Sequence, residues 1–107
     1  MAAQEAQQNV FRALADPTRR TIISMLEIGP RPIGDIAAEF DMTRPAIAKH
    51  LGILREGGII SVEAQGRERI NRLNPRGLKT AADWLNHYDR FWNARLAKLK
   101  SVIEETS

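Results

Sequence analysis

Apolar residues recur at helical spacing along the first quarter of the chain and predict two helices. The first covers Gln4–Leu14. The second covers Thr18–Ile28, because Asp16 suits the N-cap position and Pro17 suits the first turn of a helix. The Gly-Pro-Arg-Pro segment at 29–32 ends the second helix. Its predicted buried stripe consists of Ile22, Ile23, Met25 and Leu26.

The next part of the chain predicts two more helices joined by a tight connection. A short helix covers Ile33–Phe40. The fourth helix runs from about Thr43 to Arg55, since Thr43 fits an N-cap and Pro45 fits the first turn. Glycines at 57–58 end it, because glycine readily takes the left-handed conformation past a helix. Its buried stripe is predicted to be Ile47, Leu51 and Leu54, at i, i+4 and i+7.

A hairpin and a long helix complete the pattern. Ile59–Ala64 and Glu68–Leu73 are predicted strands around a turn at 65–67. Asn-Pro at 74–75 ends the hairpin, and one long helix is predicted over Leu78–Glu105, which contains no Pro or Gly. The order is α-α-α-α-β-β-α, which is mainly α with a small β-hairpin wing. We therefore predict a single winged helix-turn-helix domain over residues 1–107, in which the fourth helix enters the DNA major groove.

Basic charge is concentrated in the middle third of the chain. The whole chain has a formal net charge of +3, whereas residues 43–76 alone contain seven Lys/Arg against three Glu, a local net of +4. This part of the chain is also the predicted reading helix and wing. The distribution favours a polyanionic partner such as double-stranded DNA.

Other features of the composition exclude several classes of protein. The absence of cysteine excludes disulfides, thiolate metal sites and a thiol nucleophile. The polar N-terminus has no signal-peptide run, and no stretch approaches the roughly 20 apolar residues of a membrane span. We therefore expect a cytoplasmic protein that does not enter a membrane. No Ser/His/Asp set, Gly-rich phosphate loop or His/carboxylate cluster is present, so we do not expect an enzyme.

The order and spacing of several motifs resemble those of the ArsR-type winged-helix repressors. Together the motifs span roughly Val10–Pro75. They are Phe11–Arg20 (FRALADPTRR), Asp35–Ala37 (DIA), Thr43–Leu51 (TRPAIAKHL), Leu54–Ile60 (LREGGII) and Gly66–Arg69 (GRER). The resemblance implies a repressor that dimerises through its first and last helices.

The chain departs from this family at the positions that hold metals. Founding members carry Cys-x-Cys immediately before the position matching Asp35, where this chain has Pro-Ile-Gly at 32–34. Another branch binds zinc on the last helix, where only Asp83 and His87 lie here. The resemblance is therefore to the metal-independent subset, without a cofactor. An unidentified small-molecule or protein effector is left open.

Candidate DNA contacts lie on the exposed side of the fourth helix. Arg44, at its N-terminus, is expected to meet a base or a phosphate, since Arg pairs bidentately with guanine. Lys49 suits a phosphate, and Thr43 suits a cap, a phosphate or both. Ala46 suits a thymine methyl or simply permits close approach. For His50, which lies near DNA in the resembling family, packing beside the apolar stripe is the alternative.

Further arginines are candidates outside that helix. Arg67 and Arg69 on the wing suit the minor groove or phosphates, with a solvated hairpin tip as the alternative for Arg67. Arg31 is a candidate phosphate contact at a helix start. Arg19 and Arg20 suit either phosphates or intramolecular salt bridges.

The predicted last helix carries an apolar stripe rich in aromatic residues. A cofactor site is one reading, but the area that aromatic residues bury favours a dimer interface. We expect the end helices, about 4–15 and 78–105, to form a homodimer interface. Its residues are Val10, Phe11, Leu14, Trp84, Leu85, Tyr88, Phe91, Trp92, Leu96 and Leu99, continued by Ile103.

The sequence thus predicts a repressor that binds an inverted-repeat operator as a homodimer, with the two fourth helices in successive major grooves. The alternative from a different class is a winged-helix module for protein–protein contact. Apolar or acidic residues on the fourth helix and wing would favour that alternative.

Overall fold

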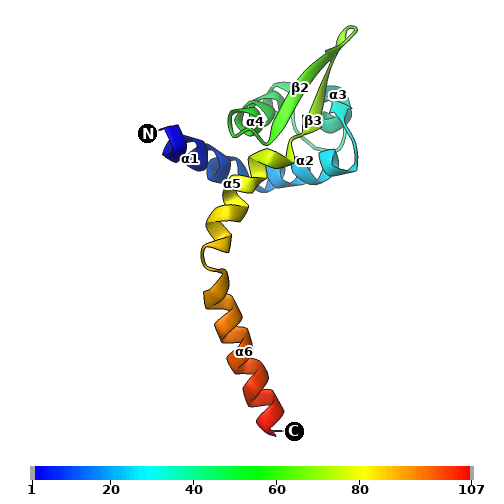
Figure 1. Cartoon of the computed structure of the whole chain (residues 1–107). Coiled ribbons are helices and arrows are strands. Elements are labelled where there is room, and N and C mark those ends of the chain that lie inside the picture. The colour runs from blue at the N-terminus through cyan, green and yellow to red at the C-terminus, as the bar shows by residue number, and fades with distance from the viewer. Residues whose placement is uncertain (1, 107) are drawn as a thin grey trace.

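The computed structural model describes residues 2–106, with side chains described for residues 4–105. It is mainly helical with a small antiparallel sheet, which confirms the predicted winged helix-turn-helix class (Figure 1). The elements in chain order are α1 (Ala2–Leu14), α2 (Pro17–Ile28), β1 (Arg31–Pro32), α3 (Ile33–Ala37), α4 (Arg44–Glu56), β2 (Ile60–Gln65), β3 (Glu68–Leu73), α5 (Pro75–Asn86) and α6 (Asp89–Thr106).

Polar side chains cap three of the helices at their N-termini. Asp16 Oδ2 accepts the backbone N–H of Arg19 at 3.1 Å, and Thr43 Oγ1 accepts that of Ala46 at 3.3 Å. Asn74 caps α5 in the same way. A proline occupies the first turn of each of these helices. These local bonds satisfy donors that the helix itself cannot pair, which is why the predicted starts of α2 and α4 are confirmed.

The end of α4 is set by the two glycines that follow it. Gly58 has φ +71°, in the left-handed region. Its N–H donates to the Arg55 carbonyl at 2.9 Å, and the Ile59 N–H donates to the Leu54 carbonyl at 3.0 Å. These two bonds form a Schellman motif, which turns the chain from α4 into the wing.

The core lies where α1, α2 and α4 pack against one another and against the sheet. The predicted stripe of α4 is confirmed, because Ile47, Leu51 and Leu54 are all buried. Val10 is a correction. We predicted it at the dimer interface, but it is 2% exposed in the core of its own chain. It lies on the face of α1 that packs on α4 and α5 rather than on the outer face.

The sheet contains one strand that the sequence pattern did not predict. Strand β1 pairs with β3, with Arg31 opposite Asn71 and Pro32 opposite Ile70, so the strand order is β1-β3-β2. Our prediction treated residues 29–32 only as a helix stop. A two-residue strand has no alternation to recognise, and its pairing partner lies forty residues away in the sequence. The predicted hairpin is confirmed, with Gly66 at φ +62° in its two-residue turn.

The last helix differs from the prediction at its start and in its middle. It begins at Pro75, and it is broken between Asn86 and Asp89 into α5 and α6. At the break the Tyr88 N–H donates to the Leu85 carbonyl at 3.0 Å, three residues back instead of four. Residues 86–89 are Asn-His-Tyr-Asp, all of modest helix propensity, and this run accounts for the interruption.

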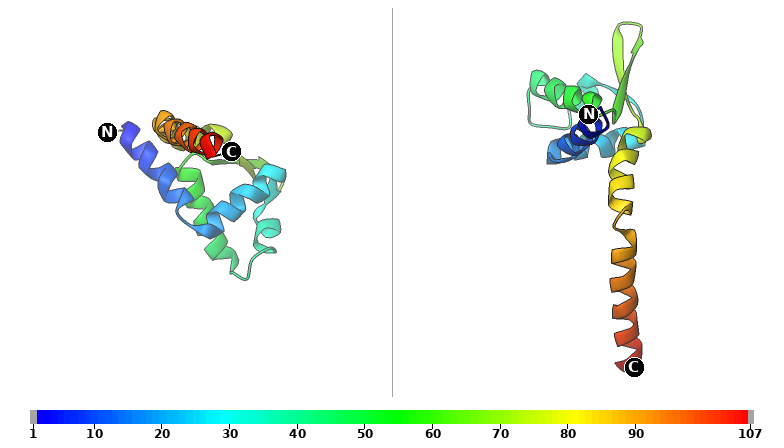
Figure 2. Two further views of the ribbon diagram at one scale, coloured as in Figure 1. Left: turned by 90° about the horizontal axis from the view of Figure 1, so that it is seen from below. Right: turned by 60° about the vertical axis from the view of Figure 1, so that its left-hand side comes forward.

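The wing and α6 project from opposite ends of the molecule (Figure 2, right). Helices α1 to α4 and the sheet form the body, and α5 leads from it into α6, which extends away as a separate column (Figure 1). Among residues 2–106 no helix has the length and apolar character needed to cross a membrane.

Candidate nucleic-acid interface

Helix α4 has one face in the core and another in solvent. Opposite the buried stripe, Arg44 and Lys49 are exposed, and Ala46 is half-buried. Thr43 is exposed and caps the helix, so its hydroxyl is already engaged with the Ala46 N–H. The short α3 precedes α4 as the first helix of the helix-turn-helix pair. This arrangement presents the N-terminal half of α4 to a ligand outside the molecule.

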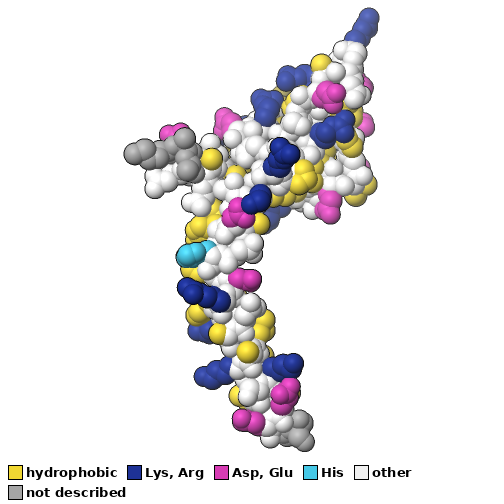
Figure 3. Space-filling model, viewed as in Figure 1, with side chains coloured by type: hydrophobic (Ala, Val, Ile, Leu, Met, Phe, Trp, Pro, Cys, Tyr) yellow, Lys and Arg dark blue, Asp and Glu magenta, His cyan; other side chains and the backbone are white. Residues whose placement is uncertain are grey.

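The wing adds arginines beside this helix. Arg67 lies in the hairpin turn and Arg69 lies on β3 opposite Ala64, and both are exposed. A cleft of about 340 Å³ lies between the wing, α3 and α4, lined by Arg44, Arg67 and Arg69 together with the carboxylates of Asp35 and Glu68. Basic side chains are visible over this part of the surface and at the tip of the wing (Figure 3).

The ion pairs of the molecule lie away from the basic residues of this surface. They include Arg12–Glu56 at 3.6 Å, Arg72–Glu63 at 3.3 Å and Lys79–Asp83 at 2.9 Å. Among the side chains described, no ion pair involves Arg44, Lys49, Arg67 or Arg69. Their charges are therefore available to neutralise phosphates.

His50 does not face outward as we expected. Its side chain is only 18% exposed, and its Nδ1 atom lies 3.1 Å from Arg19 Nη1 and 3.9 Å from Asp16 Oδ2. The alternative that we gave for His50, packing inside the protein, therefore holds for the Nδ1 edge of its ring. A DNA contact through the opposite edge stays a prediction.

Arg19 and Arg20 bind main-chain carbonyls at the end of α1. Arg19 Nε donates to the Ala13 carbonyl and Arg19 Nη2 to the Arg12 carbonyl, both at 2.9 Å. Arg20 Nη1 donates to the Leu14 carbonyl at 2.7 Å. We predicted phosphate contacts or salt bridges. The contacts are intramolecular, but their acceptors are carbonyls that a helix C-terminus leaves without helical donors.

Arg31 lies in β1, immediately before Pro32, which is the N-cap residue of α3, and its phosphate contact stays a prediction. It is half-buried, and its carbonyl accepts the Asn71 side-chain amide at 3.3 Å. Asn71 is the buried polar residue of the sheet, and this bond fixes β1 against β3. Nothing in the local sequence around residue 31 indicates this pairing.

The pKa of Asp16 lies below its ordinary value of 3.8. Desolvation by itself would raise this pKa. The backbone N–H donated by Arg19, the charge of the Arg19 guanidinium and the nearby His50 outweigh that effect. The carboxylate thus favours the folded state in its charged form.

Asp16→Asn is expected to destabilise the protein near neutral pH and to have less effect in acid. Asn keeps the N-cap but lacks the charge. Because the pKa of Asp16 is lower in the folded than in the unfolded state, its contribution is fully present above pH 3.8 and is lost as the pH falls through the folded value. Urea unfolding from pH 6 to pH 3 should show the two stability curves converging. Parallel curves would contradict this role for the charge.

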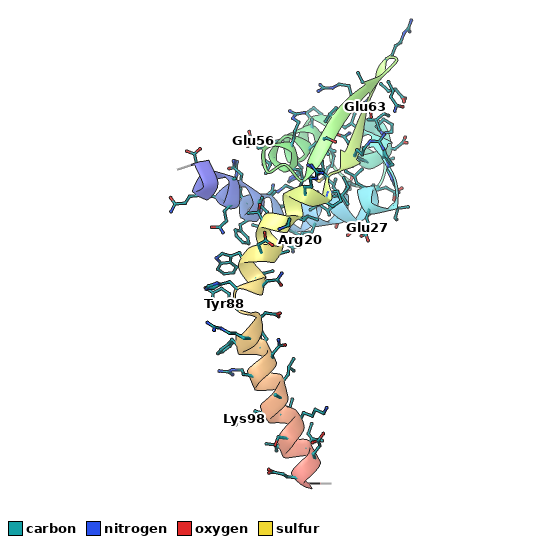
Figure 4. All side chains as sticks on the ribbon, in the orientation of Figure 1. Arg20, Glu27, Glu56, Glu63, Tyr88 and Lys98 are labelled. Carbon is teal, nitrogen blue, oxygen red and sulfur yellow. The ribbon has the colours of Figure 1, made fainter. Side chains whose placement is uncertain are left out.

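A large apolar face runs along α5 and α6. Phe11 of α1 begins it, with its ring 5.5 Å from that of Trp84 in an edge-on contact. Tyr88 projects from the column at the junction of α5 and α6 (Figure 4). The residues of this face, which we call the column face, are 43–62% exposed; they are Trp84, Leu85, Tyr88, Phe91, Trp92, Leu96, Leu99 and Ile103. Leu14, also predicted at the interface, is half-buried.

The two residues closest to the family's zinc position have other contacts. Asp83 pairs with Lys79, and the His87 ring lies 5.1 Å from that of Tyr88. Over the described part of the chain, no three His, Cys, Asp or Glu side chains gather as metal ligands.

Comparisons with known proteins agree with this geometry. Residues 16–62 match the model of the bacterial regulatory protein, arsR family. The chain is 32% identical over 104 residues to the HTH-type transcriptional regulator Rv2034 of Mycobacterium tuberculosis (strain ATCC 25618 / H37Rv), covering 97% of this chain and 94% of the relative. It is 38% identical over 80 residues to the transcriptional repressor SdpR of Bacillus subtilis (strain 168), covering 75% and 89%.

A solved ArsR-like transcriptional regulator from Rhodococcus sp. RHA1 superposes with a TM-score of 0.74 at 30% identity, covering 95% of this chain and 96% of that one. These relatives are regulators of transcription, in agreement with the prediction of a DNA-binding protein that is not an enzyme. The extent of the similarity confirms the resemblance found in the sequence, and the chain belongs to the ArsR family of bacterial transcriptional regulators.

Proposed function

We propose that this regulator is a repressor that binds an inverted-repeat operator as a homodimer and acts in the cytoplasm, where bacterial DNA is transcribed. The observation that carries the proposal is the division of α4 into a buried apolar stripe and an outer face with Arg44 and Lys49, next to a wing with Arg67 and Arg69. None of these four forms an ion pair with another side chain of residues 4–105. SdpR, a relative of this chain, is a transcriptional repressor by name.

Each residue of the outer face has a role suited to its chemistry. Arg44, on the first turn of α4, reaches base edges and pairs with guanine O6 and N7. Lys49 contacts a phosphate, which adds salt-dependent affinity without sequence preference. Ala46 leaves room for the groove wall, and the Thr43 cap fixes the start of the helix. Arg67 and Arg69 follow the backbone or the minor groove beside the same half-site.

The homodimer forms through the column face, with Phe11 of α1 at its edge. Apolar patches of this extent are rarely left in water, and a second copy of the same face is self-complementary about a two-fold axis. The single domain then comprises the whole chain, with its end helices at the dimer axis. Because the wing and α6 lie at opposite ends of the molecule (Figure 2), dimerisation through the column leaves α4 and the wing free for DNA.

A protein-binding module is the alternative function, and the unpaired positive charge on both α4 and the wing disfavours it. A surface that docks protein would carry more apolar area at its centre and fewer charges.

The test is selection of bound DNA from a random pool, followed by measurement of operator affinity for Arg44→Ala combined with Lys49→Ala. We expect a loss of about 100-fold, because a bidentate base contact is worth about 1–3 kcal/mol and the loss of a phosphate contact weakens binding further. The salt dependence of the remaining affinity should also fall. Lys98→Ala, on exposed α6, is the matched control and should bind like wild type. Wild-type affinity in the double variant would overturn the assignment of α4.

A further inference from the structure

The Arg19 guanidinium is held on three sides. Two of its nitrogens grip the Arg12 and Ala13 carbonyls at the end of α1, each at 2.9 Å. The third, Nη1, lies 3.1 Å from Nδ1 of His50 on α4. These two hydrogen bonds to α1 fix the position of the guanidinium, so Nη1 has little freedom to move away from His50.

This contact determines which nitrogen of His50 carries the proton. A guanidinium can only donate hydrogen bonds, so Nδ1 must be the acceptor. In a neutral imidazole the hydrogen then resides on Nε2. The Arg19–His50 contact therefore selects the Nε2–H tautomer.

A second group competes for the same nitrogen and favours the opposite tautomer. Asp16 Oδ2 is an acceptor and lies 3.9 Å from His50 Nδ1, which is beyond hydrogen-bond distance. Asp16 is also engaged by the backbone N–H of Arg19 at 3.1 Å. The 3.1 Å contact with the guanidinium therefore prevails. If Arg19 were removed, Asp16 would be the nearest partner of Nδ1 and would draw a hydrogen onto it.

The other ring nitrogen of His50, Nε2, keeps some contact with solvent. No hydrogen bond to Nε2 is formed within residues 4–105. Every fully buried side-chain polar atom that the structure describes has a hydrogen-bond partner. Because Nε2 has none, it is not fully buried. His50 follows Lys49 directly on α4, next to the proposed phosphate contact.

We propose that Arg19 is a positioning residue that fixes His50 as an Nε2–H donor, so that the DNA group opposite His50 is a hydrogen-bond acceptor. This rests on the proposed function of α4. The acceptors available in DNA are phosphate oxygens and, in the major groove, purine N7, guanine O6 and thymine O4. The exocyclic amino groups of adenine and cytosine only donate and are excluded as partners. His50 would thereby select against donors at its position.

The first part of the test needs no DNA. Nitrogen-15 NMR of the imidazole in the free protein, at alkaline pH where imidazoles are neutral, reports which nitrogen is protonated. We expect an unprotonated Nδ1 and a protonated Nε2 in wild type, and a shift toward Nδ1–H in Arg19→Met. Arg19→Lys, which retains a donor that cannot accept, should restore the wild-type pattern.

Arg20→Met is the matched control, because Arg20 also caps α1, through the Leu14 carbonyl at 2.7 Å, without touching His50. It should keep the wild-type tautomer. If Arg19→Met left the tautomer unchanged, or if Arg20→Met altered it equally, Arg19 would only cap α1 and the proposal would be overturned.

The second part uses the selected operator. Arg19→Met should weaken binding about tenfold, the effect of losing one charge-assisted or well-oriented hydrogen bond, and Arg20→Met should not. Operators with single methylphosphonates, 7-deazapurines, or base analogues that lack guanine O6 or thymine O4 then identify the acceptor. At the position His50 contacts, His50→Ala should cause no further loss. If His50→Ala lowered the affinity for every substituted operator as much as for the unmodified one, the assignment of an acceptor opposite His50 would be overturned.

The two proposals fail in different ways. Wild-type operator affinity in Arg19→Met, with the tautomer changed, overturns the positioning role and leaves DNA binding intact. A protein that selects no DNA at all overturns the function of α4, and with it the DNA part of this proposal, whatever the NMR spectrum shows.

Discussion

A chain carrying Trp92→Asp and Leu96→Asp is expected to be a monomer at micromolar concentrations, where wild type is a dimer. Both side chains lie on the column face, 58% and 62% exposed in the single chain. In the proposed dimer the two substitutions place four carboxylates at one apolar contact. Leaving charges unpaired at such a contact costs several kcal/mol, so we expect the dissociation constant to rise about 1000-fold or more. Sedimentation equilibrium measures this directly.

Ala94→Asp with Ser101→Asp is the matched control. It adds the same charge to α6, but about half a helical turn away from the column face, at residues that are also exposed. The control should remain a dimer with wild-type operator affinity, whereas Trp92→Asp with Leu96→Asp should lose operator affinity, since a monomer covers one half-site only. Equal dissociation of both double variants would contradict the column face as the interface.

The features that the sequence predicted correctly depend on residues that lie close together along the chain. The Thr43 cap and the stripe Ile47, Leu51 and Leu54 follow from helical periodicity and from side chains that bond their own backbone. The hairpin likewise follows from a turn and two alternating segments. These local patterns contain the information needed to predict the element, and contacts with distant parts of the chain do not change the outcome.

The features that the prediction missed depend on partners far along the chain. Strand β1 exists because it pairs with β3, where Asn71, forty residues away, also binds the Arg31 carbonyl through its side chain. Arg19 contacts His50, which lies thirty-one residues further along the chain, and the local sequence around either residue does not indicate this contact. The break at residues 86–89 is different, because the run Asn-His-Tyr-Asp is visible in the sequence. Our prediction of a continuous helix rested on the absence of Pro and Gly, and the run contains neither.

The candidate site shows the same division. Exposed Arg44 and Lys49 could be placed from α4 alone, since the buried stripe determines which residues face outward. His50 lies at the edge of that stripe, where periodicity does not decide between core and solvent. Its position is decided by Arg19 of α2 and by Asp16, the N-cap residue of α2, which only the folded structure brings near.

Gly77→Ala is expected to lower the free energy of unfolding by about 3 kcal/mol. Gly77 lies in the first turns of α5, where a Cβ atom would overlap the Gly58 carbonyl and the Ile59 backbone nitrogen. Both obstacles are main chain and cannot rotate aside. The junction is also fixed by Asn74, whose side-chain amide donates to the Gly58 carbonyl at 3.0 Å and whose N–H donates to the Ile59 carbonyl at 2.7 Å. Alanine gains about 1 kcal/mol of helix propensity over glycine, which the overlap exceeds.

Gly52→Ala is the matched control, because Gly52 lies inside α4 with nothing within 4 Å of an added Cβ. Here only propensity acts, and we expect the free energy of unfolding to rise by up to about 1 kcal/mol. Urea unfolding of both variants at one fixed protein concentration removes the contribution of dimerisation from the comparison. A Gly77→Ala chain as stable as wild type would show that α5 can move away from the end of α4. In that case the column that carries the proposed dimer interface would not be rigidly joined to the reading helix.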